Sequence, residues 1–350
     1  MRIRYTTAED GSPVQQAVIY TLDEHRISAG DVDPDALKII RRLRSAGHSA
    51  YVVGGAIRDL LLGKRPKDFD VATDASPSKI RKLFRNSRVI GKRFRLVHVY
   101  FHEKIIEVST FRSETSEVFN NVYGAIEEDV RRRDFTVNAL FFCAVEQLLL
   151  DYVDGFRDLQ TRTLRPLIPL ERIFVEDPVR MIRAIKYASA GGLTMTGPLR
   201  RTIKRSVDLL ASCPSSRMTE EVFKILQSGY ARPIIEELHR YRLLQYVVPR
   251  INEQLKDKGF RRLFFSSLDR LDQQLETEED LRRSRALAYL ACDYIYTRSE
   301  YGTLERIPFK EAFAELKHYI SPITPANKDV QKALVQLIRR RKRYRAEGQI

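Results

Sequence analysis

The stretch Gly54-Gly55-Ala56-Ile57-Arg58-Asp59-Leu60-Leu61-Leu62-Gly63 is followed closely by Lys67-Asp68-Phe69-Asp70-Val71. Apolar residues 50–53 precede the glycine pair, so we expect a buried strand, a glycine turn, a short helix and a second strand. Glycines allow close approach to the backbone, a helix N-terminus favours anions, and paired acids hold divalent cations. These parts, in this order, are those needed to bind a nucleoside triphosphate for metal-assisted chemistry.

Asp68 and Asp70 are predicted to share a metal site. Residues i and i+2 of a strand point to the same face, with α-carbons about 6.5–7 Å apart, while Phe69 between them packs inward. Glu107, in an apolar stretch, would be a third catalytic acid if its strand lies beside that of Asp70. Two Mg²⁺ ions, or Mn²⁺ in their place, could then activate an attacking hydroxyl and stabilise a leaving pyrophosphate. The alternative is a solvated acid pair and an ion-paired Glu107, which an isolated short motif would favour.

The glycine pair shifts the balance towards a ligand site. Gly54-Gly55 alone could be a plain turn, but its place between an apolar strand and a helix favours phosphate binding. Arg58, on that helix, could pair with triphosphate oxygens. Its alternative role is an ion pair with Asp59 or another nearby acid.

Local signals indicate an α/β head followed by helices. We expect a polar, irregular leader over 1–30, and a capped helix from Asp33-Pro34 to about Gly47. Apolar runs and turn signals predict strands at 50–53, 69–73, 94–101, 104–110, about 147–153 and 162–167, with a hairpin at His102-Glu103. Beyond about 170 helical periodicity dominates. The predicted domains are a leader (1–30), an α/β catalytic head (31–168), a helical neck (169–232) and a helical body with a basic tail (233–350).

Composition limits the class of protein. The 350 residues are 43% hydrophobic and carry a formal net charge of +15, which points to a polyanionic partner. Three widely separated cysteines suggest neither a disulfide framework nor a zinc site. No apolar run reaches membrane-spanning length and the start has no signal-peptide core, so we expect a soluble, cytoplasmic protein with no membrane partner.

Two further motifs complete an ordered set of four that carries a resemblance. The glycine and acidic motifs are followed by Arg132-Arg133-Asp134-Phe135-Thr136-Val137-Asn138-Ala139 and then by Glu176-Asp177-Pro178-Val179-Arg180. In this order, from about residue 25 to about 250, the chain resembles the class II tRNA nucleotidyltransferase and bacterial poly(A) polymerase family. The resemblance implies an α+β fold: a nucleotidyltransferase head with a small mixed sheet flanked by helices, then an all-helical neck, an RNA-binding body and a tail.

The resemblance also implies residue roles. Asp68 and Asp70 would ligate the catalytic metals, and Arg132, Arg133, Asp134 and Asn138 would surround the sugar and triphosphate. Asp177 and Arg180, with Arg183 one turn further, would contact the nucleotide base as a protein template, since positions i and i+3 of a helix share a face. From the residues alone, Asp177-Pro178 could equally be a helix cap with salt-bridging arginines. Asp134 could likewise cap a helix containing Val137, Ala139 and Leu140.

Basic residues are the candidates for RNA binding. The stretch 89–99, with Lys92, Arg93 and Arg95, resembles the poly(A) polymerase branch and would place cations beside the catalytic strands. The C-terminal run Arg339-Arg340-Arg341-Lys342-Arg343 could grip RNA phosphates. An ordinary strand edge and a solvated helix end are the alternatives. His98, which alternates with apolar neighbours, is interpreted as a core histidine.

The sequence therefore predicts template-independent addition of AMP from ATP to RNA 3′ ends, with release of pyrophosphate. The first alternative is a tRNA nucleotidyltransferase that adds CCA, CC or A, which would use the same residues. A non-catalytic RNA-binding protein conflicts with the intact Asp68/Asp70 pair. Nucleotidyl transfer to a small molecule would leave the basic charge unexplained.

Overall fold

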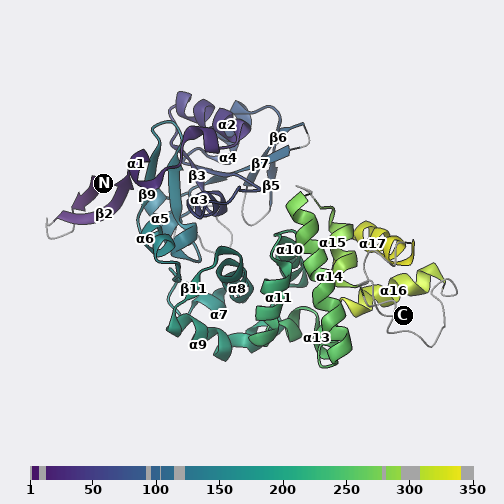
Figure 1. The fold of residues 1–350 in the computed structure, drawn as a ribbon. Coiled ribbons are helices and arrows are strands. Elements are labelled where there is room, and N and C mark those ends of the chain that lie inside the picture. Colours follow the sequence, from purple (N-terminus) through teal and green to yellow (C-terminus); the bar gives the residue numbers. More distant parts are fainter. Residues whose placement is uncertain are drawn as a thin grey trace. The chain divides into compact units, whose positions relative to one another are not determined.

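The computed structural model describes residues 2–7, 13–91, 96–102, 104–113, 123–277, 281–292 and 308–339. The chain divides into two compact units (Figure 1). Met1–Leu170 and Thr194–Thr196 form the first, here called the head unit. Glu171–Leu193 and Gly197–Ile350 form the second, the helical unit. The predicted order, a mixed α+β part followed by a helical part, is confirmed.

One mixed sheet organises the head unit. Its described strands follow the order β1-β2-β9-β8-β3-β4-β7-β6-β5. Their bounds are β1 Arg2–Thr7, β2 Pro13–Tyr20, β3 Ala50–Val53, β4 Asp70–Thr73, β5 Ser87–Ile90, β6 Leu96–Phe101, β7 Lys104–Thr110, β8 Leu140–Cys143 and β9 Leu148–Asp151. Among these described neighbours only β4 and β7 run parallel. A small parallel pair, β10 Thr163–Leu164 and β11 Thr194–Met195, lies apart from this sheet.

Short helices cover and connect these strands. They are α1 Leu22–His25, η1 Ala29–Asp31, α2 Pro34–Ser45, α3 Gly55–Leu61, α4 Pro77–Leu83, α5 Ile126–Arg131, η2 Thr136–Asn138 and α6 Gly155–Gln160. α2 begins as predicted, because Oδ1 of Asp33 accepts the amides of Asp35 at 2.9 Å and Ala36 at 3.3 Å. α2 and α4 contact each other and the sheet, α2 at β3 and β4 and α4 at β5 and β6 (Figure 1). The predicted hairpin of β6 and β7 is confirmed by their antiparallel pairing.

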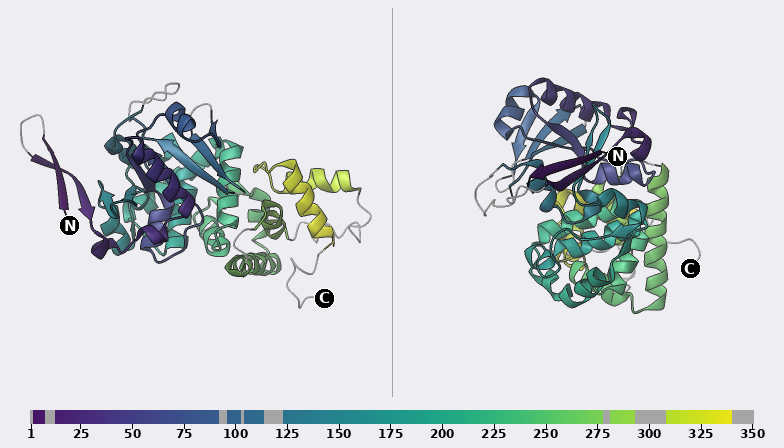
Figure 2. Two further views of the ribbon diagram at one scale, coloured as in Figure 1. Left: turned by 90° about the horizontal axis from the view of Figure 1, so that it is seen from above. Right: turned by 90° about the vertical axis from the view of Figure 1, so that its left-hand side faces the viewer.

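The irregular leader predicted over 1–30 is wrong in its described part. β1 and β2 form an antiparallel ribbon, and β2 continues the sheet by pairing with β9. Figure 2 shows this ribbon extending beyond the other strands. The apolar run at residues 17–20 explains the pairing, because it places Ala17 and Val18 in the core, 2% and 7% exposed.

The alternative helix after Asp134 is also wrong. Only a single 3-10 turn, η2, forms, and the chain then enters β8. All four residues Leu140–Cys143 are buried, since β8 lies between β3 and β9 in the sheet. A strand buried on both faces has a continuous apolar sequence, which local periodicity does not distinguish from a buried helix.

The helical unit contains helices packed around a separate core. They are α7 Ile173–Glu176, α8 Val179–Gly191, α9 Gly197–Ser206, η3 Val207–Ser212, α10 Ser215–Leu226, α11 Ala231–Arg240, α12 Leu244–Val247, α13 Pro249–Gln254, α14 Lys258–Thr277, α15 Arg283–Leu290, α16 Phe309–Tyr319 and α17 Asn327–Arg339. α8 packs against α10 and α11, α11 against α14, and α15 against α17 (Figure 1). The helical periodicity predicted beyond about residue 170 is confirmed in α11, where Ile234, Ile235 and Leu238 are buried. No helix in the described ranges combines the length and apolar character that crossing a membrane requires.

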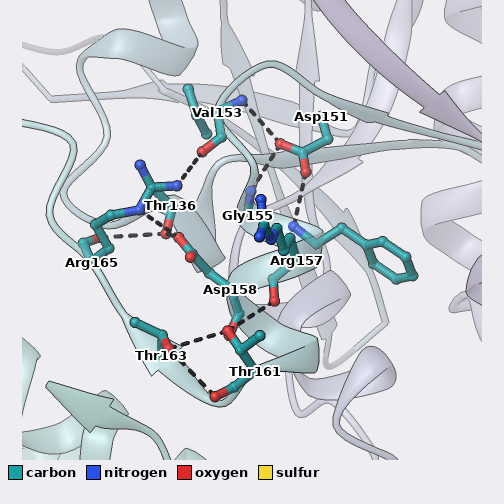
Figure 3. A network of polar contacts seen from close by, with 10 residues as sticks. Thr136, Asp151, Val153, Gly155, Arg157, Asp158, Thr161, Thr163 and Arg165 are labelled. Atoms are coloured by element: carbon teal, nitrogen blue, oxygen red, sulfur yellow. Dashed lines mark hydrogen bonds and ion pairs between the residues drawn. The ribbon is translucent and has the colours of Figure 1, made fainter. Parts of the chain in front are cut away.

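A buried polar network fixes η2 to the following loop and helix (Figure 3). Oδ2 of Asp158 accepts a hydrogen bond from Oγ1 of Thr136 at 2.5 Å and one from Nε of Arg165 at 2.9 Å. Nη2 of Arg165 donates to the carbonyl oxygen of Val153 at 2.9 Å. Because Asp158 is only 8% exposed, these bonds satisfy a carboxylate that would be costly to bury alone.

Asp151 orders the start of α6 in the same way. Its carboxylate accepts the amides of Val153 and Gly155 at 3.0 Å and of Phe156 at 2.9 Å. Gly155 then lies directly against η2, where an added Cβ would be 2.3 Å from the carbonyl oxygen of Thr136. Only glycine permits this approach without backbone movement.

A buried ion pair joins α8 to α10 in the helical unit. Nζ of Lys186 lies 2.5 Å from Oε2 of Glu221, and the two side chains are 10% and 6% exposed. Arg183 and Lys224 also approach Glu221, at 3.3 Å and 3.7 Å. Burial alone would raise the pKa of Glu221, but these cations, Lys186 foremost, hold that pKa below its usual range. Burial lowers the pKa of Lys186 despite its acidic partner.

We expect Gly155→Ala to lower the free energy of unfolding by about 1–3 kcal/mol, since the new methyl group forces η2 and α6 apart. Denaturant unfolding measures this change. Gly30→Ala is the matched control, because its Cβ would lie 3.4 Å from Oγ of Ser28, a side-chain atom that can move. Equal stability of Gly155→Ala and the wild-type chain would contradict the close packing.

We expect Glu221→Gln to lower the free energy of unfolding by about 3 kcal/mol at pH 7, because it leaves the buried Lys186 ammonium without its carboxylate. Glu221 has a lowered pKa in the folded state, so its contribution is present above the unfolded pKa and is lost as the pH falls through the folded pKa. The difference between wild type and variant should therefore shrink in acid.

Glu253→Gln is the control for this prediction. Glu253 also pairs with a lysine, Lys256, but at 3.7 Å and with both side chains more than three-quarters exposed, at 77% and 78%. Its replacement should change the unfolding free energy by no more than about 0.5 kcal/mol. A similar loss in both variants would show that burial of the Lys186–Glu221 pair is unimportant.

Candidate active site

The two predicted metal-binding aspartates lie where β4 begins. Asp68 and Asp70 are exposed, whereas Phe69 between them is 8% exposed and packs into the core. This alternation is the one expected of extended backbone. Burial of Phe69 in the core therefore fixes this segment with Asp68 and Asp70 facing solvent.

The glycine pair and the acidic pair meet at one end of the sheet. β3 ends at Val53, directly before Gly54, and Val53 lies opposite Asp70 in the antiparallel pair of β3 and β4. Asp68 lies just before the paired residues, at the same end. Two motifs that the chain separates by a helix are therefore neighbours in the sheet.

Glu107 lies on the next strand. β4 and β7 are parallel with Val71 opposite Val108, so Glu107 occupies the register position beside Asp70. The strand order on which its prediction depended is therefore present. Glu107 is exposed, and its Oε1 lies 3.2 Å from Nε2 of His98 across the β6–β7 pair. The interpretation of His98 as a core residue is wrong, because it faces this carboxylate with a 21% exposed side chain.

These carboxylates do not form a closed metal cage. Within the described ranges, no group of three or more histidine, cysteine or acidic side chains is close enough to hold a metal ion. The donor set nevertheless fits Mg²⁺, which prefers oxygen ligands and is usually held by one or two carboxylates, substrate phosphates and water. Asp68 and Asp70 supply such carboxylates on one exposed surface.

Asn138 reaches the same end of the sheet from β8. β3 also pairs antiparallel with β8, with Val53 opposite Phe141, and Asn138 lies two residues before β8 begins. Nη1 of Arg58 donates to Oδ1 of Asn138 at 2.8 Å. The first and third motifs of the head unit are therefore in direct contact.

Arg58, Asn138 and Asp134 form a chain of hydrogen bonds. Nε and Nη2 of Arg58 also donate to Oδ1 of Asp59 at 2.9 and 2.7 Å, which is the alternative ion pair that the sequence left open. Nδ2 of Asn138 donates to Oδ1 of Asp134 at 3.1 Å, and that oxygen also accepts the amide of Phe135. Since arginine has no acceptor, these contacts fix the orientation of the Asn138 amide.

Arg132 and Arg133 are held by backbone and acidic oxygens. Nη1 of Arg132 donates to the carbonyl of Ser113 at 2.9 Å. Nη1 and Nη2 of Arg133 donate to the carbonyl of Asn138 at 3.1 Å and to Oδ2 of Asp129 at 3.0 Å. The Nε of Arg133 is buried and has no hydrogen-bond partner among the described residues.

Both glycines lie against these guanidinium groups. An added Cβ would be 3.5 Å from Nη1 of Arg133 at Gly54 and 3.6 Å from Nη2 of Arg58 at Gly55. Gly54 also has a φ of 72° and a ψ of −129°, a backbone conformation that other residues rarely adopt. The glycine turn, the two arginines and Asn138 thus form one continuous cluster in the head unit.

The predicted base-contacting residues belong to the helical unit. Asp177 lies between α7 and α8, and its Oδ1 accepts the amide of Val179 at 3.3 Å. Asp177 has extended dihedral angles and Pro178 has helical ones, so the two residues also form the cap and first-residue pair that the sequence left open. Arg180 shares a face with Asp177, as expected, with Nε of Arg180 4.0 Å from Oδ2 of Asp177.

Arg217 is a contact that the sequence reasoning missed. Its Nη2 lies 2.5 Å from Oδ2 of Asp177, although the two residues are 40 positions apart. No local spacing connects them, since the contact depends on α10 packing against α8. Arg180 is also held from its other side, because Nη1 donates to the carbonyl of Ile173 and to Oε2 of Glu176, both at 3.1 Å.

The structure describes only some of the remaining predicted nucleotide-binding and RNA-binding residues. Nη1 of Arg183 lies 3.3 Å from Oε1 of Glu221, and its guanidinium carbon lies 5.2 Å from the ring centre of Tyr187. Arg339, at the end of α17, is exposed. The other predicted RNA-binding residues lie outside the described residues; they are Lys92, Arg93, Arg95, Arg340, Arg341, Lys342 and Arg343.

Segments of both the head unit and the helical unit match families of known proteins. Residues 50–165 match the family described as the poly A polymerase head domain. Residues 192–255 match the family described as the probable RNA and SrmB-binding site of polymerase A. The solved structure of the Bacillus stearothermophilus CCA-adding enzyme with CTP is similar at a TM-score of 0.58 and 27% identity, covering 89% of this chain and 82% of that one.

Curated relatives extend the similarity across most of the chain. Poly(A) polymerase I of Salmonella typhi is 39% identical over 300 residues, 79% of this chain and 64% of the relative. Poly(A) polymerase I of Haemophilus influenzae is 37% identical over 284 residues, 76% of this chain and 62% of the relative.

A curated CCA-adding enzyme is similar over a shorter part. The enzyme of Bacillus subtilis is 35% identical over 218 residues, 60% of this chain and 54% of the relative. This chain thus spans less than two thirds of the length of each of these curated relatives. With the head and RNA-binding matches and the ordered motifs, the chain belongs to the class II tRNA nucleotidyltransferase and poly(A) polymerase family.

Proposed function

We propose that this protein is a template-independent polynucleotide adenylyltransferase, a poly(A) polymerase that adds AMP from ATP to RNA 3′ ends and releases pyrophosphate. The observation that carries the proposal is the exposed Asp68/Asp70 pair beside Gly54, in a chain 39% identical to poly(A) polymerase I. We also propose that the protein acts in the cytoplasm, where its proposed substrates RNA and ATP are available.

Asp68 and Asp70 would hold two Mg²⁺ ions, with Glu107 in the adjoining register as a third carboxylate. Bound Mg²⁺ supplies Lewis-acid stabilisation of the charge that develops on the phosphate oxygens. The RNA 3′-oxygen forms a bond to the α-phosphorus of ATP while the bond to pyrophosphate breaks, and the hydroxyl proton leaves to solvent. Such a reaction depends mainly on positioning and on stabilisation of negative charge, and two carboxylates on one strand face would hold the cations that this requires.

The cluster of Arg58, Arg132, Arg133 and Asn138 would position the sugar and triphosphate. Asn138 is suited to this role because Arg58 and Asp134 fix both ends of its amide. Gly54 and Gly55 leave the backbone open beside the guanidinium groups, where phosphate oxygens can accept hydrogen bonds.

Asp177 and Arg180 would contact the edge of the adenine base. A carboxylate accepts and a guanidinium donates, so the pair offers both kinds of hydrogen bond. Arg217 holds Oδ2 of Asp177 in the structure, and the Val179 amide contacts Oδ1, so the acid has a fixed orientation. Arg183 would support this group from the next turn of α8.

The second candidate is a tRNA nucleotidyltransferase that adds CCA, or only CC or A. It is favoured by the 35% identity to the CCA-adding enzyme of Bacillus subtilis. The residues proposed above would serve both reactions, so nucleotide choice has to be measured.

We expect long tails when the purified chain receives ATP alone with a generic single-stranded RNA, and little incorporation from CTP alone. The same assay with tRNA that lacks its terminal CCA is the comparison. Product length on a sequencing gel gives the result. Additions that stop after one to three nucleotides and occur only on tRNA would establish the second candidate instead.

We expect the double variant Asp68→Asn and Asp70→Asn to lose AMP incorporation by a factor of about 10³ or more, since it removes the charges that would hold both metals. RNA binding measured without ATP should stay near the wild-type value. Asp74→Asn is the matched control, because Asp74 is exposed just after the same strand but contacts Nδ1 of His48 at 3.1 Å. Full activity of the double variant would refute the metal assignment.

A further inference from the structure

A basic pocket lies in the helical unit between α9 and the end of α11. It has a volume of about 380 Å³ and is lined by Gly197, Arg200, Arg201, Lys204, Arg240 and Tyr241. None of these residues belongs to the group around Asp177. The pocket is therefore a separate feature of the helical unit.

The charge of this pocket is strongly one-sided. Its lining contains four cationic side chains and no carboxylate. Arg200, Arg201 and Lys204 are exposed and form no ion pair with any residue in the described part of the chain, whereas Arg240 pairs with Glu237 at 2.5 Å. Like charges at neighbouring helix positions destabilise the helix slightly, so the cluster is arranged for an anion rather than for stability.

The pocket also has a fixed floor. Tyr241 is 6% exposed, and its ring centre lies 5.9 Å from Nζ of Lys204 and 5.3 Å from the guanidinium carbon of Arg240. Cations at these distances are attracted to the ring, which holds the lysine of α9 and the arginine of α11 on one site. An added Cβ at Gly197 would lie 3.4 Å from Nη1 of Arg201, so this guanidinium lies over a bare Cα.

We propose that this pocket binds phosphodiester groups of the RNA strand whose 3′ end is extended. Guanidinium groups match phosphate oxygens with paired donors, and lysine adds a compact charge. The lining offers no exposed aromatic ring for base stacking and no amide side chain for reading base edges. Binding is therefore independent of RNA sequence, as extension of generic RNA requires.

The proposal rests on the proposed function and makes it more specific. All six lining residues fall within 192–255, the segment that matches the probable RNA and SrmB-binding family. The structure adds the pocket, its residues and the chemical group that they hold. Free phosphate or a nucleotide shares this chemistry, and an acidic protein surface is the competing macromolecule.

The test compares two triple variants of the full chain. R200A/R201A/K204A removes three charges from the pocket, and alanine preserves the helix. R41A/K79A/K82A removes three exposed charges from α2 and α4 of the head unit, none of them in a proposed site, and is the matched control. Circular dichroism and thermal unfolding establish that both variants are folded.

Binding of a fluorescent 20-nucleotide single-stranded RNA is measured without ATP between 50 and 200 mM salt. We expect the pocket variant to bind at least about tenfold more weakly at the lower salt concentration. Its salt slope should be shallower by about 2, because three lost phosphate contacts contribute about 0.7 each. The control should stay within about twofold of wild type, and the KM for ATP should be unchanged in the pocket variant.

Three results would overturn the proposal. Wild-type RNA affinity and slope in the pocket variant would exclude RNA and leave an acidic protein surface as the occupant. An equal loss in the control would show that only total charge matters. A raised KM for ATP with unchanged RNA affinity, or full displacement of RNA by millimolar inorganic phosphate, would indicate a site for small anions. The RNA-binding measurement contains no nucleotide. Its result therefore tests the pocket even if the chain proves to add CCA to tRNA.

Discussion

The pairing of β3 with its two neighbours determines where the functional side chains of the head unit lie. Val53 lies opposite Asp70 on one side and opposite Phe141 on the other. A shift of one residue in either pair would turn every side chain of that strand to the other face. This register brings the glycine turn, the acidic pair and Asn138 to one end of the sheet, and the parallel β4–β7 pair adds Glu107. The proposed chemistry therefore depends on backbone pairing before it depends on any single side chain.

The loop that carries Asn138 needs a second support, because η2 is only one turn long. Buried Asp158 binds Thr136 and Arg165, and Gly155 lets α6 approach the same turn (Figure 3). These residues contact no proposed substrate group. They fix the backbone on which Asn138 is oriented, and small displacements of positioning groups are costly in catalysis.

The sequence predicted correctly those features that depend on residues close together in the chain. The features that it failed to predict all depend on contacts between distant residues. The capped start of α2, the β6–β7 hairpin and the inward Phe69 between two outward aspartates all follow from residues close in sequence. β2 and β8 depend on strands far along the chain, so their apolar runs looked irregular or helical. Arg217 was missed as a partner of Asp177 for the same reason, since only the packing of α10 on α8 brings them together.

The arginines proposed to bind the nucleotide and the cations of the α9 pocket differ in the partners that a bound phosphate would have to displace. Arg58, Arg133 and Arg180 each donate to protein oxygens in the structure, so a nucleotide that uses them exchanges one acceptor for another. The net gain of such an exchange is small, but its geometry is strict, which suits selection of one nucleotide. In the pocket of α9, Arg200, Arg201 and Lys204 have no acidic partner among the described residues. There a bound phosphate would replace only water and counterions, which would favour affinity without selectivity. This division of roles suits the proposed function, in which the enzyme would choose one nucleotide but accept many RNA sequences.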